Sequence, residues 1–183
     1  MHDTDRRVIY TKKILRASLM TLLEEKPISR ISVTELCSAA GVNRGTFYSH
    51  YRQPEDVMHQ IEDDLIRELE KVLDGECEMY EIHKRVLMIL DENRSACRVL
   101  FGPNGDDACI KRVLDVSFRY FRDTWQHVLN VSDEMVGYIH SFISAGTVQL
   151  LKDWITNDRG RTPGEMAEII FRLQQNTLSN MHM

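Results

Sequence analysis

The residues with the clearest chemical potential lie close together, between positions 43 and 50. The residues expected to face outward there are Asn43, Arg44, Gly45, Thr46, Tyr48, Ser49 and His50. They supply hydrogen-bond donors and acceptors and one guanidinium group, and they include no carboxylate. Such a surface suits phosphate groups and base edges, because one arginine can donate two hydrogen bonds to a guanine. The segment therefore predicts a contact with double-stranded DNA.

Two short helices are expected to hold these residues. Ser32 and Glu35 fit a capping box at the start of a helix that ends at Ala40. Gly41 can adopt the left-handed conformation of a turn, and Asn43 can cap a following helix. Apolar residues at Val33, Leu36, Ala40, Val42 and Phe47 are spaced to pack these helices together and onto an earlier one. The pattern predicts a helix-turn-helix, whose second helix fits the major groove.

The rest of the chain also has helical periodicity, and no alternating strand pattern occurs in it. Further helices are expected at about 11–25, 54–73, 79–93, 95–100, 107–129, 133–157 and 163–178, with a break at 101–105. The fold class predicted is all-α. An N-terminal three-helix helix-turn-helix domain, residues 1–53, is followed by a helical ligand-binding and dimerisation domain, residues 54–183. The helix at 54–73 is expected to contribute to both.

The charge distribution supports this division. Residues 1–52 hold nine Lys and Arg against five Asp and Glu, whereas the remaining residues hold 14 against 23. A basic end on an acidic body indicates that this end meets a polyanion. The first residues lack the apolar core of a signal peptide. The uncharged stretch 135–151 contains five polar residues and fits a buried helix better than a membrane span. A cytoplasmic location without a membrane partner is expected.

The segment Gly41-Val42-Asn43-Arg44-Gly45-Thr46-Phe47-Tyr48-Ser49-His50-Tyr51 resembles the recognition segment of TetR-family transcriptional regulators. The resemblance covers about residues 8 to 60. Weaker similarity in the C-terminal half, at 142–146, 150–154 and 162–167, resembles a subgroup around DhaS-like regulators of dihydroxyacetone utilisation. The resemblance implies a repressor that binds a palindromic operator as a homodimer, and a small apolar or aromatic effector ligand that releases it.

The resemblance also implies roles for individual residues. Arg44 and Thr46 are expected at base edges, and Gly45 allows the helix backbone to approach DNA. Phosphate contacts are expected from Tyr48, His50, Ser32 and Arg52, with an accessory contact from Thr34. Pro54 occupies a position where the family usually has a lysine that contacts the DNA backbone. Alternatives remain: Arg44 and Thr34 as ordinary solvated residues, His50 as a packing residue, and Tyr51 half-buried against the helix at 54–73.

The last two helices are expected to form the homodimer. Small or apolar residues suited to a close helix pair are Gly137, Ser141, Ser144, Ala145, Met166, Ile169, Ile170 and Leu173. With their symmetry mates these helices could form a four-helix bundle. The alternative is that these stripes pack only within one chain.

A ligand pocket is expected in the body. Its candidate lining residues are Met79, Tyr80, Met88, Phe101, Phe118, Phe121 and Trp125. Each of them could instead be ordinary core. His83, His127 and His140 are dispersed and fit surface or packing roles better than a metal site. The four cysteines fit buried small hydrophobic residues, with a redox sensor as the alternative.

Other classes of protein are less favoured. No phosphate loop, nucleophile elbow, metal-binding spacing or paired catalytic carboxylates occur in the sequence, so an enzyme, a cofactor and a metal are not expected. A co-regulator that keeps the fold but acts through a protein partner is the alternative function. It is allowed by the DhaS-like resemblance and by Pro54.

Overall fold

The computed structural model describes residues 3–75, 78–102, 107–157 and 160–179. Within these ranges all regular structure is helical, as predicted. The α-helices are α1 (Asp3–Glu25), α2 (Val33–Ala40), α3 (Arg44–Tyr48), α4 (Pro54–Leu73), α5 (Met79–Glu92), α6 (Arg94–Phe101), α7 (Asp107–Leu129), α8 (Asp133–Asn157) and α9 (Pro163–Ser179). A 3-10 helix, η1 (Ile28–Arg30), joins α1 to α2. Among the described residues, no helix combines the length and apolar character that a bilayer span requires.

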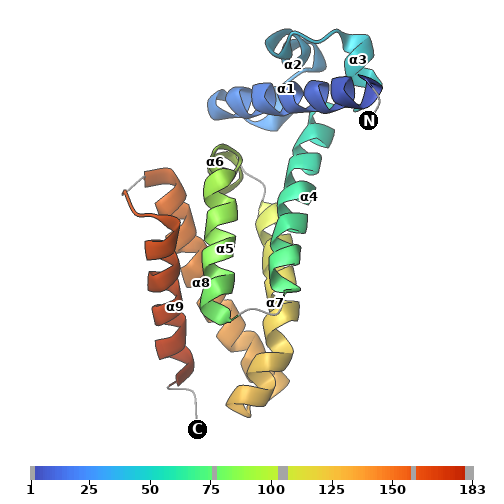
Figure 1. The fold of residues 1–183 in the computed structure, drawn as a ribbon. Helices are drawn as coiled ribbons and strands as arrows, with labels where there is room; N and C mark the ends of the chain where they lie inside the picture. Colours follow the sequence, from blue (N-terminus) through green and yellow to red (C-terminus); the bar gives the residue numbers. More distant parts are fainter. Residues whose placement is uncertain (1–2, 76–77, 103–106, 158–159, 180–183) are drawn as a thin grey trace.

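The first three α-helices form a head at one end of the molecule (Figure 1). Leu15, Leu19 and Leu23 follow each other at intervals of four residues and are buried on one face of α1. Leu36 of α2 and Phe47 of α3 have no exposed surface and belong to the same core. Helices α1 and α2 therefore hold α3 by its buried side, and the opposite side of α3 is exposed to solvent.

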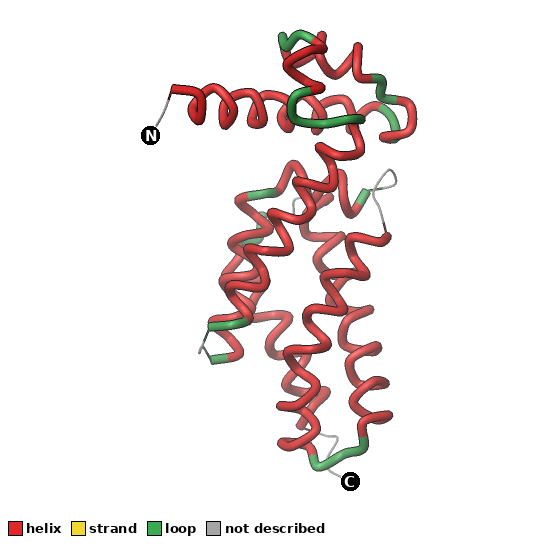
Figure 2. The backbone as a smooth tube through the Cα atoms, turned by 90° about the vertical axis from the view of Figure 1, so that its right-hand side faces the viewer, coloured by secondary structure: helices red, strands yellow, loops and turns green. Residues whose placement is uncertain are grey.

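The long helix α4 joins the head to the body, as both views of the backbone show (Figures 1 and 2). Pro54 occupies its first position, where a missing N–H costs no helical hydrogen bond. The Asp56 carboxylate accepts from the backbone N–H groups of Arg52 at 2.7 Å and Gln53 at 3.2 Å. Buried residues from Val57 to Leu73 pack first against α1 and then against α5 and α7. One helix thus shares its apolar face between head and body.

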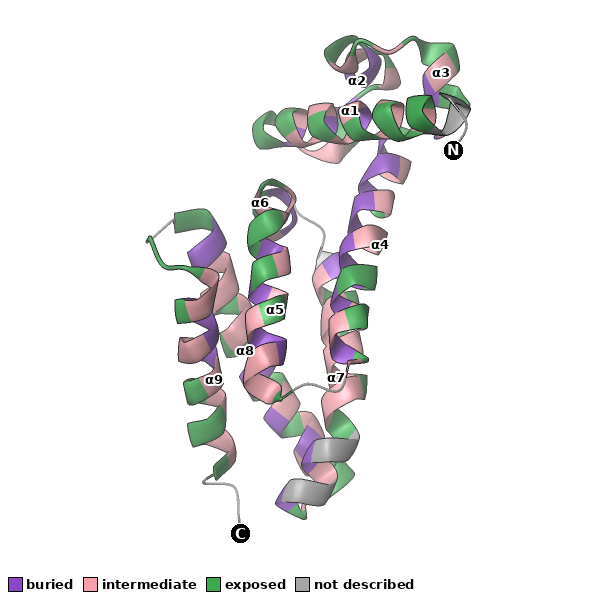
Figure 3. Cartoon of the chain, in the orientation of Figure 1, coloured by how far each residue is buried: buried purple, intermediate pink, exposed green. Residues whose placement is uncertain are grey.

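The body consists of α5 to α9, with α5 and α9 packed side by side over much of their length (Figure 1). Its core is continuous with that of the head, because one cluster of buried residues extends from Leu15 to Ile170. A second cluster around Trp125 and Ile139 joins α7 to α8. Buried residues follow the inner faces of the helices, while exposed ones cover their outer faces (Figure 3). The proposed division into residues 1–53 and 54–183 stays a prediction.

Two differences from the sequence-based expectation concern helix ends. The apolar stripe predicts a first helix from about Thr11, whereas α1 begins at Asp3. Its first turns carry exposed residues such as Arg6 and Ile9, so no apolar periodicity marks them. The 3-10 helix η1 was not expected either, since three residues are too short for a periodic signal. The predicted break at 101–105 lies largely outside the described residues.

The cysteines within the described ranges are buried, as expected. Cys37, Cys97 and Cys109 are at most 4% exposed. Burial raises the pKa of the Cys97 thiol to about 12, so this group stays protonated at neutral pH. A protonated, inaccessible thiol is a poor nucleophile, which argues against a redox sensor at this position. Cys77 lies outside the described residues.

Candidate nucleic-acid interface and body cavity

Local hydrogen bonds define the turn between α2 and α3. The Ser32 hydroxyl accepts from the backbone N–H of Glu35 at 3.2 Å and caps α2. Gly41 ends that helix with φ of 65°, a conformation that favours glycine. The Asn43 side chain then accepts from the backbone N–H of Thr46 at 2.8 Å and caps α3. The caps from Ser32 and Asn43 and the turn at Gly41 are those that the sequence predicts, but the Glu35 carboxylate, which was expected to complete a capping box with Ser32, pairs with Lys26 instead.

Helix α3 turns one side inward and the other outward. Phe47 is completely buried and its ring lies 5.9 Å from that of Tyr51. Tyr48 is 51% exposed, and the exposed Arg44 lies over its ring at 5.8 Å. The Arg44 guanidinium also donates to the Tyr48 hydroxyl at 3.5 Å, a long hydrogen bond. The two side chains therefore form a pair on the exposed side of α3, where a guanidinium can reach a nucleic acid.

Most other predicted DNA-binding residues share this exposure. Ser32, Thr34, Asn43, Gly45, Ser49 and Arg52 are exposed, and Thr46 and His50 are half-buried. The Ser49 hydroxyl already donates to the carbonyl of Thr46 at 2.7 Å. Tyr51 was expected to be half-buried, but it is only 6% exposed, because the cores of α1, α3 and α4 meet around it. The exposed set lies on the head and offers hydrogen-bonding groups to solvent.

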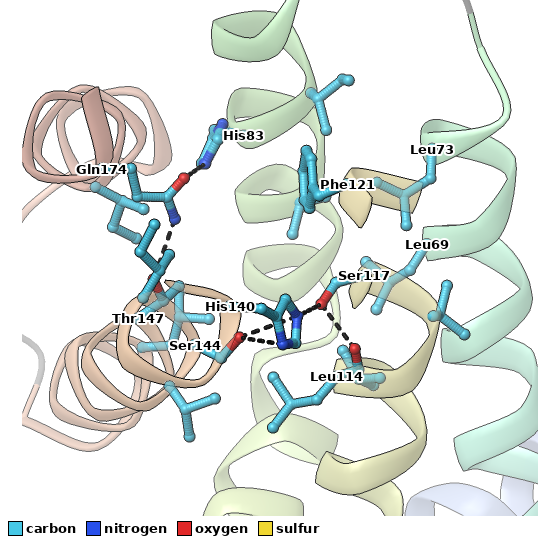
Figure 4. A pocket seen from close by; sticks show the side chains of 18 of the residues that line it. Leu69, Leu73, His83, Leu114, Ser117, Phe121, His140, Ser144, Thr147 and Gln174 are labelled. Carbon is cyan, nitrogen blue, oxygen red and sulfur yellow. Dashed lines mark hydrogen bonds between the residues drawn. The ribbon is translucent and has the colours of Figure 1, made fainter. Parts of the chain in front are cut away.

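The body contains a cavity of about 150 Å³, partly open to solvent, between α4, α5, α7, α8 and α9. Its wall is mainly aliphatic and aromatic. The polar side chains that line it are His83, Ser117, His140, Ser144, Thr147 and Gln174. Figure 4 shows that these polar groups gather around α8, while Leu69 and Leu73 of α4 face them from the opposite wall.

The polar side chains form two hydrogen-bonded groups. In the first, the His140 ring lies 3.0 Å from the Ser117 hydroxyl and 3.1 Å from the Ser144 hydroxyl through Nε2. In the second, Gln174 joins the Thr147 hydroxyl at 3.1 Å to Nε2 of His83 at 2.9 Å. Burial lowers the pKa of His140, although Asp115 acts in the opposite direction. The ring is therefore neutral at pH 7.

The observed wall differs from the expected one. Phe121 and Trp125 line the cavity, as expected, whereas the other five candidates are not among its lining residues: Met79, Tyr80, Met88, Phe101 and Phe118. Met88 is 45% exposed because it lies on the outer side of α5. Tyr80 packs on Phe171 instead, Phe101 packs on the main core, and the Phe118 ring packs on His140 at 4.8 Å. Residue type alone does not say which face of a helix an aromatic side chain occupies.

Sequence reasoning missed the polar half of the wall. His83 and His140 were expected to be dispersed packing or surface residues, but both reach the same cavity. A signal was present in α8, where His140, Ser144 and Thr147 stand at spacings of four and three residues and so share one helix face. His127 lies among the side chains that the structure does not describe.

The expected dimer residues divide into two groups. Ser144, Met166 and Ile170 are at most 8% exposed and pack inside their own chain, which corrects their assignment to a surface face. Ser141, Ala145 and Leu173 are exposed, while Gly137 and Ile169 are half-buried. Phe142, also expected on the pairing face of α8, is 69% exposed, and Tyr138, which was not expected there, is 62% exposed. The outer face of α8 is thus more apolar than expected.

Comparison with known proteins decides the family. Residues 78–176, more than half of the chain, match the family model described as "Transcriptional regulator C-terminal region". Residues 14–61 match the model of "Bacterial regulatory proteins, tetR family". The chain belongs to the TetR family of transcriptional regulators. In this TetR-family chain the second match contains α2 and α3 and the first contains the cavity residues from α5 to α9.

Individual relatives are more distant. The dhaKLM operon transcriptional activator DhaS of Lactococcus lactis is 23% identical over 129 residues, which cover 68% of this chain and 62% of DhaS, less than two thirds of its length. A TetR transcriptional regulator from Streptococcus agalactiae has a similar structure, with a TM-score of 0.68 and 20% identity over 93% of this chain and 97% of that one. FadR of Thermus thermophilus, a TetR-family repressor crystallised with lauroyl-CoA, has a TM-score of 0.53 and 19% identity over 90% and 93%. These structural similarities show the fold of this TetR-family protein.

Proposed function

We propose that this protein represses transcription by binding a palindromic operator as a homodimer, with α3 of each copy in a major groove, and that a small molecule in the body cavity releases it. The observation that carries the proposal is the exposed Arg44–Tyr48 pair on α3. Phe47, buried on the opposite side of the helix, anchors α3 in the core so that this pair faces outward. Together with Thr46 and Asn43, this pair offers donors to base edges and phosphates.

We propose a homodimer because a single head contacts too little DNA to select one sequence. A single α3 of five residues contacts too few base pairs for useful specificity, whereas two heads on a two-fold axis contact a palindrome. The exposed apolar residues Tyr138 and Phe142 on α8 and Leu173 on α9 support a helix-to-helix interface there. Exposed Ser141 and Ala145 lie beside them and are small enough to let a partner helix approach.

Ligand control is supported by the cavity and by its position. Leu69 and Leu73 of α4 line it, and the other end of the same helix packs against α1 of the head. A ligand that favours one arrangement of α4 would favour one separation of the two heads, which is a shift between populations of conformers. The Thermus thermophilus repressor with its bound lauroyl-CoA supports control by a ligand in general.

Selection of bound DNA from a random-sequence pool tests the proposal, because it examines binding, symmetry and half-site spacing together. We expect an inverted repeat, and an affinity that falls steeply with salt as counterions are released. A protein that binds no DNA alone but is retained on a promoter with a partner protein would instead support the co-regulator function. DhaS is called an activator, so the effect of deleting the gene on the selected promoter distinguishes repression from activation.

Replacing Arg44 tests its role in this binding. We expect Arg44→Ala to weaken operator binding by about 1–3 kcal/mol and to relax base preference at one position of the half-site, since a bidentate arginine–guanine contact has this effect. Electrophoretic mobility shift with the selected operator measures both. Arg85→Ala, which removes an exposed arginine from α5, is the matched control. Equal affinities of Arg44→Ala and the wild type would exclude the contact.

A further inference from the structure

We propose that the body cavity binds an uncharged amphiphile about the size of a substituted benzene, with one hydroxyl or carbonyl group directed toward α8 and its apolar part toward α4. This inference rests on the proposed function, because it names the chemical class of the molecule that would release the protein from DNA. It is argued from the size of the cavity, the charge of its wall and the positions of its polar groups.

The size of the cavity suits a compact molecule. Its volume is about 150 Å³. A cavity of roughly 150 Å³ with an aliphatic and aromatic lining accommodates benzene. Ile66, Leu69 and Leu73 form an aliphatic wall on one face of α4, and such a ring would pack against this wall. A ring with one or two small substituents fits this space.

The composition of the wall disfavours ionic ligands. None of the described residues that line the cavity is Lys, Arg, Asp or Glu. The histidine in the first polar group, His140, has its pKa lowered by burial and is uncharged at pH 7. A carboxylate or ammonium ion would therefore leave water without meeting a Lys, Arg, Asp or Glu side chain in this lining, which is unfavourable. The lining therefore favours a neutral molecule.

The polar groups define one edge of the site. His140, Ser144 and Thr147 lie on one face of α8 (Figure 4). Ser117 of α7 is hydrogen-bonded to His140, and Gln174 of α9 is hydrogen-bonded to Thr147. Their hydroxyl and imidazole groups both donate and accept, so one of these hydrogen bonds can be exchanged for one with a ligand hydroxyl. An entirely apolar ligand would form no hydrogen bond with these polar groups.

An aromatic surface adjoins the polar edge. The rings of Phe121 and Trp125 are stacked, with centroids 5.2 Å apart and planes 13° from parallel, and Trp125 lies 6.3 Å from His140. Among the described residues, the buried indole N–H of Trp125 has no hydrogen-bond partner. Aromatic rings favour offset or edge contacts with another ring, and an unpaired donor nearby favours a ligand oxygen. Both features point to an aromatic alcohol or ketone rather than an alkane.

Three probes of similar size test this assignment: 4-methylphenol, toluene and 4-methylbenzoate. Titration at pH 7, followed by calorimetry and by tryptophan fluorescence, measures their dissociation constants. We expect 4-methylphenol to bind roughly 3–10 times more tightly than toluene, the difference that one hydrogen bond makes. 4-Methylbenzoate should bind at least about 30 times more weakly than 4-methylphenol, because its charge is desolvated. Tightest binding of the carboxylate, or equal binding of 4-methylphenol and toluene, would overturn the inference.

Matched variants locate the binding site. Ser144→Ala removes a hydroxyl from the polar edge and should reduce the preference for 4-methylphenol over toluene to about 2-fold or less. Ser95→Ala removes an exposed hydroxyl from α6, outside the cavity and the proposed dimer interface, and should leave the preference unchanged. If thermal unfolding shows that Ser144→Ala is not folded, Thr147→Val replaces it at the same edge. An unchanged preference in the folded variant places the probe elsewhere and overturns the inference.

Mobility shifts on the same preparations separate this inference from the proposed function. Protein that binds the selected operator but none of the three probes at millimolar concentration retains the DNA-binding function and contradicts the ligand class. Protein that binds 4-methylphenol with the expected selectivity but binds no DNA supports the ligand class and contradicts the proposed repressor.

Discussion

Gly45 illustrates how a single residue shapes the surface of α3. A Cβ at this position would lie 3.3 Å from the side-chain oxygen of Asn43, the atom that caps the helix. Any other residue would therefore press on the cap and would also add bulk to the exposed side. Glycine keeps the cap intact and leaves room for a DNA backbone to approach. In the proposed complex Arg44 and Tyr48, on either side of Gly45, would make the polar contacts with DNA.

His140 is the residue whose protonation has the clearest consequence. Its pKa is lowered in the folded protein by burial, whereas in the unfolded chain it has the ordinary value of about 6.5. The unfolded chain therefore takes up the proton first as the pH falls. The stability that accompanies the neutral ring is complete above pH 6.5 and is lost progressively below it.

We expect the free energy of unfolding to fall as the pH drops below 6.5, with a slope from this one group of at most about 1.4 kcal/mol per pH unit. Urea denaturation at several pH values measures the slope. His140→Gln should show a shallower slope than the wild type, and His59→Gln, which changes an exposed histidine on α4, should not. Identical slopes for the wild type and His140→Gln would show that the ring does not titrate differently on folding.

Among the elements, α4 has the most demanding position, since it packs against both head and body. A polar cluster fastens it to the head: the Arg16 guanidinium of α1 pairs with the Asp64 carboxylate and donates to the carbonyl of Gln60 at 3.3 Å. Arg67 also pairs with Asp64, at 2.9 Å. Burial raises the pKa of Asp64, but the hydrogen bonds and charges of the two arginines outweigh it, so the net pKa lies below the ordinary value.

We expect Asp64→Asn to reduce the free energy of unfolding at pH 7 by about 1–2 kcal/mol, because Arg16 loses a charged partner that is partly shielded from water. The contribution of Asp64 is present above its unfolded pKa of about 3.9 and is lost as the pH falls through its lower folded pKa, so the difference between wild type and variant should be smaller at pH 3 than at pH 7. Chemical denaturation at pH 7 and pH 3 gives both values. Glu68→Gln, one turn further along α4, is the control, and an equal loss in that variant would contradict a specific role for Asp64.

At the scale of the whole molecule, the outer side of α8 is the feature that a single chain does not explain. Tyr138 and Phe142 are 62% and 69% exposed, although buried residues such as Ile139 and Ile143 alternate with them on the inner side. Large exposed apolar side chains close together are typical of interfaces. The proposed dimer would cover this side in both copies, and the two heads would then face one duplex.

We expect Phe142→Glu to weaken dimerisation by about 2–4 kcal/mol, since a central aromatic anchor is lost and a charge is placed in an apolar contact. Analytical ultracentrifugation over a range of concentrations measures the dissociation constant. Met88→Glu changes an apolar residue on α5 that is also exposed, at 45%, and should leave the constant unchanged. Equal dimerisation of Phe142→Glu and the wild type would place the interface elsewhere.

Local signals account for the parts of the structure that sequence reasoning predicted correctly. Ser32, Gly41 and Asn43 act through atoms of residues at most a few positions away, so their caps and turn follow from the order of residues. Pro54 marks the start of α4 for the same reason. The inward position of Phe47 follows from helical periodicity. Such interactions are available to the chain before it folds further, and so the helix-turn-helix could be recognised directly.

By itself, then, the order of residues determined the helical class, the ends of most helices and the outward set on α3, because these depend on neighbours along the chain. Only the tertiary structure decided that His83 and His140, 57 positions apart, line one cavity, that Met88 faces solvent and that Met166 and Ile170 are buried within their own chain. Each of these depends on how a helix is rotated about its axis against partners distant in sequence. An amphipathic pattern indicates that one face of a helix is buried. Which other helix buries that face is decided by tertiary packing.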